Sequence, residues 1–113
     1  MLERLDGIRA AAYERGDVAM LAEVWAPGAR LRRDADQLRE LLASGATARG
    51  VRHRFGVLTL LSESDRRVRL RVGQWLPPAV LLRGGRVVGR LAAGRPADVL
   101  VELVRVPGGW RLS

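Results

Sequence analysis

Apolar side chains recur at three- and four-residue intervals in the first part of the chain, which is the spacing of a helix face. The apolar positions of residues 2–16 share one such face: Leu2, Leu5, Ile8 and Ala12. Gly16 follows, and glycine commonly ends a helix because it adopts the left-handed conformation without strain. The pattern therefore predicts a first helix over residues 2–16.

Two further helices are predicted before residue 46. Asp17 suits the N-cap of a short helix over residues 18–25. Asp34 suits the N-cap of a third helix over residues 34–45. The apolar stripe of this third helix consists of Leu38, Leu41 and Leu42.

From residue 49 onward, apolar and polar side chains alternate, which is the period of a β-strand. The predicted strands cover residues 51–61, 67–76, 79–91 as a hairpin, 97–106 and 110–113. Gly56 is expected to form a bulge in the first strand, and Gly84-Gly85 the tip of the hairpin.

Helices followed by hairpin-connected strands predict an α+β fold, in which three N-terminal helices pack on one face of an antiparallel sheet. Bulges and glycines in long strands indicate that the sheet curves strongly around the helices and leaves a cavity at its open end. A chain of 113 residues is expected to form one domain, residues 1–113, with room for one core.

Composition argues against several kinds of site. The chain has no cysteine and one histidine, so disulfides, thiolate chemistry and the usual metal sites are not expected, and no cofactor is predicted. No apolar run approaches the roughly 18 residues that span a bilayer. The N-terminal MLERLDGIR also lacks the apolar core of a signal peptide. We expect a soluble protein without membrane contacts, cytoplasmic by default.

The formal net charge of +8 raises the question of nucleic-acid binding. All 20 basic residues are arginines, which are spread over the predicted helices, strands and turns instead of forming one block. The interleaved aromatic residues of a base-stacking surface are missing. We therefore expect no nucleic-acid partner and interpret the arginines as a solvated surface.

The stretch RAAAYERGDVAMLAEVWAPGA and the closing GGWRL resemble the NTF2-like superfamily, also called the SnoaL-like or cystatin-related α+β cone. Within it, the chain is similar to small actinobacterial domains that open with AAAYxxGDxxxLxxVYAPGS and end in DGWR. The resemblance covers nearly the whole chain and implies a cone with a pocket between helices and sheet. The superfamily contains isomerases, hydratases, dehydratases, polyketide cyclases, transport factors and ligand-binding modules, so the resemblance indicates the fold more strongly than the function.

The chain departs from this group at two places near the expected pocket mouth. It has Trp25-Ala26-Pro27-Gly28-Ala29 where the group has Tyr-Ala-Pro-Gly-Ser, and Gln74-Trp75-Leu76-Pro77 where the group often has Asp-Thr-Leu-Pro. Such exchanges would reshape a pocket. They suggest the hypothesis of a natural scaffold engineered to bind a small molecule, with a reconstructed or metagenomic relative as the alternative.

Gln74 interrupts the apolar face of a predicted strand. In residues 67–76 arginines alternate with Val68, Leu70 and Val72, and Gln74 occupies the next position on the apolar face. The amide either lines a pocket or lies at a frayed strand end. Trp25 and Trp75 are expected near the mouth, as walls for a flat apolar ligand or as part of a dimer interface.

Four residues are candidates for polar contacts or proton transfer. His53 shares a strand face with Phe55, and its side chain is the best proton-transfer candidate, although a structural role is the simpler interpretation. Glu102 is a further acid or base candidate, whereas Asp98 is expected to pair with surface arginines. Tyr13 lies on the first helix, and the resemblance to ketosteroid-isomerase-like proteins implies an oxyanion donor there; a core tyrosine is the alternative.

Two functions remain in competition. The first is a binding module for a hydrophobic, steroid- or polyketide-like molecule, with Gln74, Trp25, Trp75, His53, Phe55 and Tyr13 as ligand-binding residues. The second is an enzyme that works by general acid–base catalysis with His53, Glu102 and Tyr13. The binding module is favoured, because the sequence does not force two titratable groups together. A homodimer through the open sheet face is a third interpretation.

Overall fold

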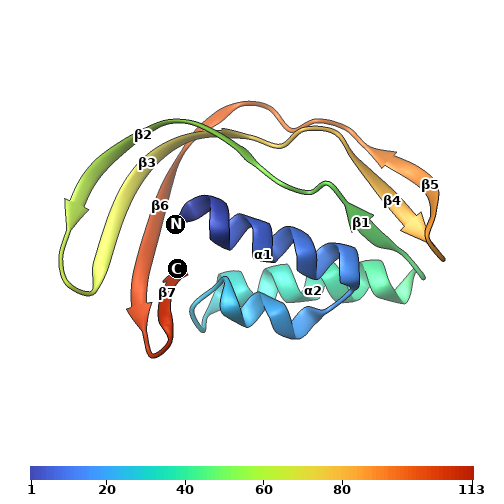
Figure 1. The fold of residues 1–113 in the computed structure, drawn as a ribbon, viewed down its shortest axis with the longest axis horizontal. Coiled ribbons are helices and arrows are strands. Elements are labelled where there is room, and N and C mark those ends of the chain that lie inside the picture. Colours follow the sequence, from blue (N-terminus) through green and yellow to red (C-terminus); the bar gives the residue numbers. More distant parts are fainter.

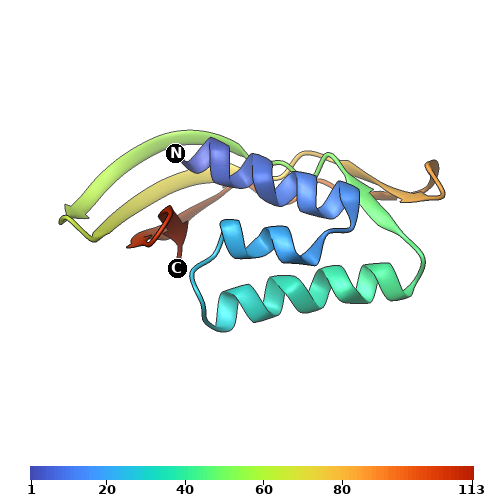
Figure 2. The same ribbon diagram turned by 60° about the horizontal axis from the view of Figure 1, so that its bottom comes forward.

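The computed structural model describes residues 1–113 and has the predicted α+β architecture, in which curved antiparallel strands arch over N-terminal helices (Figure 1). Three helical segments come first: α1 (Leu2–Arg15), the 3₁₀ helix η1 (Val18–Glu23) and α2 (Ala29–Ala43). Seven strands follow: β1 (Thr47–Arg49), β2 (Arg54–Glu63), β3 (Arg67–Trp75), β4 (Ala79–Arg83), β5 (Arg86–Leu91), β6 (Ala97–Val106) and β7 (Gly109–Leu112). Figure 2 shows η1 between α1 and α2.

The strands form two antiparallel sheets. The larger sheet has the order β2-β3-β6-β7 and the smaller one β1-β4-β5. β3 and β6 pair without interruption from Arg67 opposite Val104 to Gln74 opposite Ala97. Because opposite residues of an antiparallel pair share a face, this register determines which side chains of β6 face the helices.

The predicted end of the first helix is confirmed, and the predicted start of the third is wrong. Gly16 ends α1 in the left-handed conformation, with φ of 68°. Asp17 occupies the N-cap of η1, but its side chain makes no capping hydrogen bond. α2 begins at Ala29, because Leu31 extends the apolar stripe of Ala35 and Leu38 by one turn toward the N-terminus. Asp34 is therefore an interior residue of α2, and its side chain is buried.

The strands confirm the predicted glycine positions and shift one boundary. The register of β2 against β3 changes between Phe55 and Leu58, so a bulge includes Gly56 as predicted. Gly84 and Gly85 form the hairpin tip, with φ of 56° and 78°. The strand predicted over residues 51–61 begins at Arg54 in the structure, and the short β1 before it was not predicted.

The core consists of two apolar clusters. The first joins the helices to β1 and β4: Ala12, Tyr13, Leu21, Ala35, Leu38, Ala48, Val51 and Ala79. The second joins the start of α1 to the larger sheet: Leu2, Leu5, Val24, Leu70, Val72 and Leu103. Val99 and Val101 pack against the second cluster, so the odd-numbered residues of β6 in this region face inward. Trp25 packs against both clusters.

The end of η1 is tied to the last strand. The backbone N–H of Ala26 donates to the carbonyl of Leu112 at 2.7 Å, and the N–H of Leu112 donates to the carbonyl of Val24 at 2.7 Å. These bonds place Trp25 beside β7. None of the helices combines the length and the apolar character that crossing a membrane requires.

Candidate functional site

A cavity of about 620 Å³ lies between the two α-helices and the larger sheet. Two groups of residues line it. The helices and their connection contribute Leu2, Asp6, Arg9, Trp25, Arg30, Arg33, Asp34 and Gln37. The sheet and the C-terminal residues contribute His53, Phe55, Gln74, Val99, Leu100, Val101, Glu102, Leu112 and Ser113.

Helical spacing brings the polar residues of both helices to this cavity. Asp6 and Arg9 of α1, three residues apart, line the cavity, and Tyr13 follows four residues later on the same side of the helix but is buried behind the wall. In α2, Arg30, Asp34 and Gln37 recur at four and three residues. The apolar stripes of the two helices build the core, and the adjacent polar stripes form the cavity wall.

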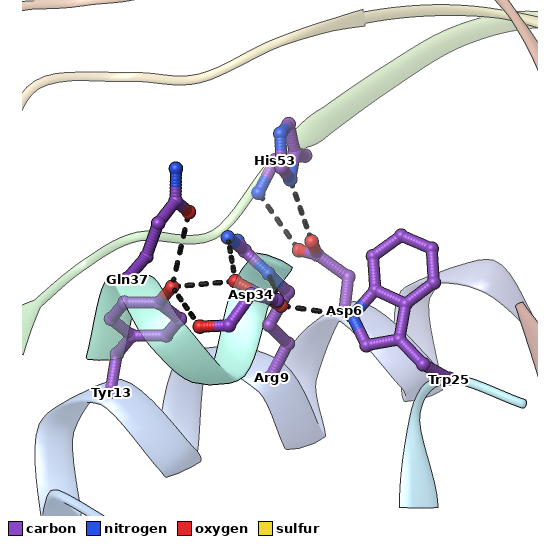
Figure 3. A network of polar contacts seen from close by, with 7 residues as sticks. All are labelled: Asp6, Arg9, Tyr13, Trp25, Asp34, Gln37 and His53. Carbon is purple, nitrogen blue, oxygen red and sulfur yellow. Dashed lines mark hydrogen bonds and ion pairs between the residues drawn. The ribbon is translucent and has the colours of Figure 1, made fainter. Parts of the chain in front are cut away.

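Asp34 is the centre of a buried polar network between α1 and α2 (Figure 3). Arg9 donates from Nε to Asp34 Oδ2 at 2.7 Å and from Nη2 to Oδ1 at 2.9 Å. The Tyr13 hydroxyl donates to Oδ1 at 2.5 Å, and the Trp25 indole N–H donates to Oδ2 at 2.9 Å. One carboxylate thus joins both helices to the indole that forms part of the cavity wall.

The network holds Asp34 and Arg9 in their charged forms. Burial alone would raise the pKa of Asp34, but the hydrogen bonds from Arg9, Tyr13 and Trp25 and the charge of Arg9 outweigh it, so the pKa lies below its ordinary value. Burial would also lower the pKa of Arg9, and its bonds to Asp34 reverse this effect. Burial and the hydrogen bond to Asp34 raise the pKa of Tyr13, so its hydroxyl remains a donor.

A second carboxylate, Asp6 of α1, holds His53. Asp6 Oδ2 accepts the backbone N–H of His53 at 2.8 Å, and Asp6 Oδ1 lies 2.7 Å from His53 Nδ1 (Figure 3). Asp6 is 6% exposed. When Asp6 is a carboxylate, Nδ1 must carry the hydrogen, so Nε2 of the neutral ring keeps its lone pair. The His53 ring also stacks against Phe55, with centroids 6.2 Å apart.

Before Leu103, β6 has no strand partner on the edge that faces β7, and this edge borders the cavity. Four consecutive residues, Val99 to Glu102, line the cavity, because β7 pairs with β6 only from Leu103 to Val106. The Glu102 carboxylate itself is bound by arginines of β3, at 2.9 Å from Arg67 and 3.7 Å from Arg69. This arrangement leaves Glu102 poorly suited to act as an acid or base on a molecule in the cavity.

Gln74 lies opposite Phe55 in the β2–β3 pair, and both side chains line the cavity. The Gln74 side chain is half-buried and makes no hydrogen bond to the protein. Its amide therefore has a free donor and a free acceptor at the cavity wall.

The structure brings together only some of the residues singled out from the sequence. Trp25, His53, Phe55 and Gln74 line one cavity. Tyr13 is buried behind Asp34 and does not line the cavity.

Trp75 lies outside this cavity. It borders a neighbouring surface hollow with Arg52, Arg54 and Pro77, and His53 and Phe55 line both this hollow and the cavity. Asp98 is exposed opposite Gly73 on the outward face and has no ion pair, so its predicted pairing with arginines is not seen.

Sequence reasoning missed the carboxylates at the centre of the site. Asp34 was interpreted as an N-cap. No role in a site was predicted for Asp6 and Arg9, because they lie beside the apolar stripe of α1. The spacing of Asp6, Arg9 and Tyr13 was the available signal, because it places three polar side chains along one side of a helix. The structure contains no group of three or more His, Cys, Asp or Glu residues that could hold a metal ion.

Comparison with solved structures supports the fold. The intermembrane space region of the chloroplast protein ARC6 is 19% identical, with a TM-score of 0.67 over 97% of this chain and 85% of that chain. A Catenulispora acidiphila protein in complex with S-DNPA is 17% identical, with a TM-score of 0.55 over 96% and 83%. Aln2 from a Streptomyces species is 18% identical, with a TM-score of 0.54 over 96% and 80%.

These identities are too low to transfer a function, so the likeness concerns the fold alone. The last two neighbours come from actinobacteria, and one of them contains a small molecule. No protein-family model and no curated protein matches the sequence.

Proposed function

We propose that the chain is an NTF2-like domain that binds a small, largely apolar molecule in the cavity between its helices and its larger sheet. The observation that carries this proposal is the composition of the cavity wall. Aromatic and aliphatic side chains, among them Trp25, Phe55 and Val101, surround the unpartnered amide of Gln74. A volume of about 620 Å³ falls within the range of small-molecule sites.

Affinity in such a site would come mainly from apolar burial. Each 100 Å² of apolar ligand surface removed from water contributes about 2.5 kcal/mol before the cost of immobilising the ligand. Gln74 would add orientation, because a ring ketone or hydroxyl can pair with its amide, whereas a hydrocarbon leaves it unsatisfied. The complex of the Catenulispora acidiphila protein with S-DNPA agrees with a ligand-binding role for this fold.

The substitution Gln74→Leu tests the orientation of the ligand. It should leave the free energy of unfolding within about 1 kcal/mol of wild type, because the amide has no partner in the protein. It should weaken the binding of ring ketones and alcohols by roughly five- to tenfold relative to hydrocarbons of the same shape. Thermal shift and tryptophan quenching with a panel of such compounds provide the measurement.

Trp75→Phe is the matched control, because Trp75 follows Gln74 in β3 but is not among the residues that line the cavity. It should leave the ligand profile unchanged. An unchanged profile in Gln74→Leu, or a lost profile in Trp75→Phe, would contradict the proposed site. No stabilisation of wild type by any compound of a broad panel would contradict the proposed function itself.

A second candidate function is general acid–base catalysis, which the pairing of Asp6 with His53 favours. Asp6 binds two atoms of His53 and thereby fixes the ring and its tautomer, with Nε2 as the acceptor for a substrate proton. His53 would be the general base and Asp6 a positioning residue. Their geometry supplies the close pair of titratable groups that the sequence alone did not reveal.

Proton abstraction from an enolisable ring ketone tests this candidate. Deuterium exchange at the carbon next to the carbonyl should be faster with wild type than with His53→Gln by a factor of roughly 10²–10⁴. Asp6→Asn should lower the rate while ketone binding persists, as expected for a positioning residue. An exchange rate in wild type equal to that in buffer would rule out the enzymatic function and leave the binding function intact.

The predicted homodimer also remains part of the proposal. Apolar side chains of β2 are exposed, including Val57 at 80%. Such a surface is typical of a contact between protein chains.

A further inference from the structure

The carboxylates that line the cavity are already occupied by donors of the same chain. Asp34 binds Arg9, and Asp6 binds His53. Glu102 is paired with arginines of β3. No side-chain carboxylate of the cavity wall is therefore left to balance a further positive charge.

Two arginines of the same wall have no such partner. Arg30 and Arg33 of α2 line the cavity and are exposed, and neither forms an ion pair or a side-chain hydrogen bond. Arg9, the third arginine of the cavity wall, differs in this respect, since it binds Asp34. The cavity thus combines an apolar wall with an excess of positive charge on its α2 side.

We infer that the ligand of this cavity is an organic acid, with an apolar ring body against Trp25 and Phe55 and a carboxylate toward Arg30 and Arg33. This inference rests on the proposed binding function and adds the chemical class of the ligand. Guanidinium groups bind carboxylates through paired N–H donors, whereas a neutral ligand would gain no ion pair with either arginine.

Matched pairs of acids and amides test the inference. Calorimetric titration would compare one-, two- and three-ring aromatic carboxylic acids with their primary amides, which keep the ring and lose the charge. At low ionic strength the best acid should bind at least about threefold more tightly than its amide, a modest factor because both arginines are exposed. The preference should shrink as salt is added.

A double variant locates the effect. Arg30→Gln with Arg33→Gln should reduce acid binding to the level of the amide and leave amide binding unchanged. Arg32→Gln with Arg90→Gln is the control, because both are exposed arginines that lie outside the cavity wall, and the change in net charge is the same. The control should keep most of the acid preference.

The possible outcomes distinguish a failure of the proposed ligand class from a failure of the proposed binding function. Equal affinity for acid and amide, or an equal loss in the control variant, would overturn the inference and leave the binding function standing. Binding of neither member of any pair would overturn both. A preference for the acid that only the Arg30 and Arg33 variant abolishes would establish the class of ligand.

Discussion

At the scale of single residues, Asp34 is the side chain on which the helices and the cavity wall both depend. Its side chain is 5% exposed and receives hydrogen bonds from Arg9, Tyr13 and Trp25. A buried carboxylate is tolerated only when donors replace its lost hydration. These donors come from α1 and from the segment before α2, so the network joins parts of the chain that are distant in sequence.

The substitution Asp34→Asn should destabilise the fold. It leaves Arg9 without its counter-charge in a largely buried position, and we expect a loss of roughly 2–4 kcal/mol in the free energy of unfolding at pH 7. Tyr13→Phe removes one donor and keeps the ring under Arg9, so it should cost only about 1 kcal/mol. Urea denaturation followed by circular dichroism measures both.

The same network predicts an acid dependence of stability. The pKa of Asp34 in the folded chain lies below its ordinary value of 3.8, so the carboxylate stabilises the fold above that value. The stabilisation is lost as pH falls through the lower folded-state pKa. The difference between wild type and Asp34→Asn should therefore be constant near neutral pH and narrow below about pH 4. A difference that does not change down to about pH 2 would contradict this account of Asp34.

At the scale of elements, the end of α1 is set by one glycine. Gly16 has a φ of 68°, and a Cβ there would lie 2.7 Å from the Cδ2 atom of Leu42 in α2. Both the backbone conformation and the close contact disfavour a side chain at this position. The turn from α1 into η1 is therefore most stable with glycine.

Two substitutions in this helix should have opposite signs. Gly16→Ala should lower the free energy of unfolding by about 1–2 kcal/mol, through left-handed strain and the clash with Leu42. Gly7→Ala, in the interior of α1, should raise it by about 0.5–1 kcal/mol, because the nearest atoms belong to the movable end of Arg52, at 3.3 Å. Thermal unfolding of both variants decides the matter. Equal effects of both substitutions would contradict the structural reason given for Gly16.

Local signals in the sequence were sufficient for most elements. Gly16, Gly56 and Gly84-Gly85 mark a helix end, a bulge and a hairpin tip, because each reflects a backbone conformation specific to its own segment. The start of α2 was misplaced because aspartate is a preferred N-cap residue. Asp34 is instead a buried residue inside α2, and its burial against α1 is a tertiary feature that the local sequence does not reveal. The short β1 was missed because its strand structure depends on pairing with β4, more than 30 residues away.

The candidate site was less predictable than the fold for the same reason. Gln74 was identified because it breaks an alternation within one strand. Asp6 and His53 are 47 residues apart, and Tyr13 and Asp34 are 21 apart, so only the packing of the helices against the sheet brings each pair together. Trp75 was expected near the mouth together with Trp25, but it does not line the cavity, because it follows Gln74 in β3 and neighbouring residues of a strand point to opposite faces.

At the scale of the whole molecule, a net charge of +8 limits where two copies can approach each other. β2 is an edge strand of the larger sheet and carries no charged residue between Arg54 and Glu63. Leu58 and Leu60 of this stretch are 51% and 53% exposed. We therefore place the proposed homodimer contact on this stretch of β2.

The double substitution Leu58→Ser with Leu60→Ser tests the dimer. Light scattering should show a mass of wild type that rises with concentration toward twice that of one chain, and this rise should be lost in the variant. Val87→Ser with Val88→Ser is the control, because these residues of β5 are similarly exposed, at 54% and 52%, but lie between Arg86 and Arg90. A monomeric mass of wild type at every concentration would contradict the homodimer.

The central claim is that the cavity between the helices and the larger sheet is the binding site. The most direct test is a titration with the best-binding ring acid, in which the chemical shifts of the backbone and indole N–H groups are followed by NMR. The signal of the Trp25 indole N–H is sensitive to ligand in the cavity, since this group donates to Asp34 at 2.9 Å and both residues line the cavity, whereas Trp75 does not line it. The account predicts saturable shifts at the Trp25 indole, the Gln74 amide and Val99, with the Trp75 indole unchanged. Shifts centred on Trp75, or the absence of shifts at the residues of the cavity, would contradict it.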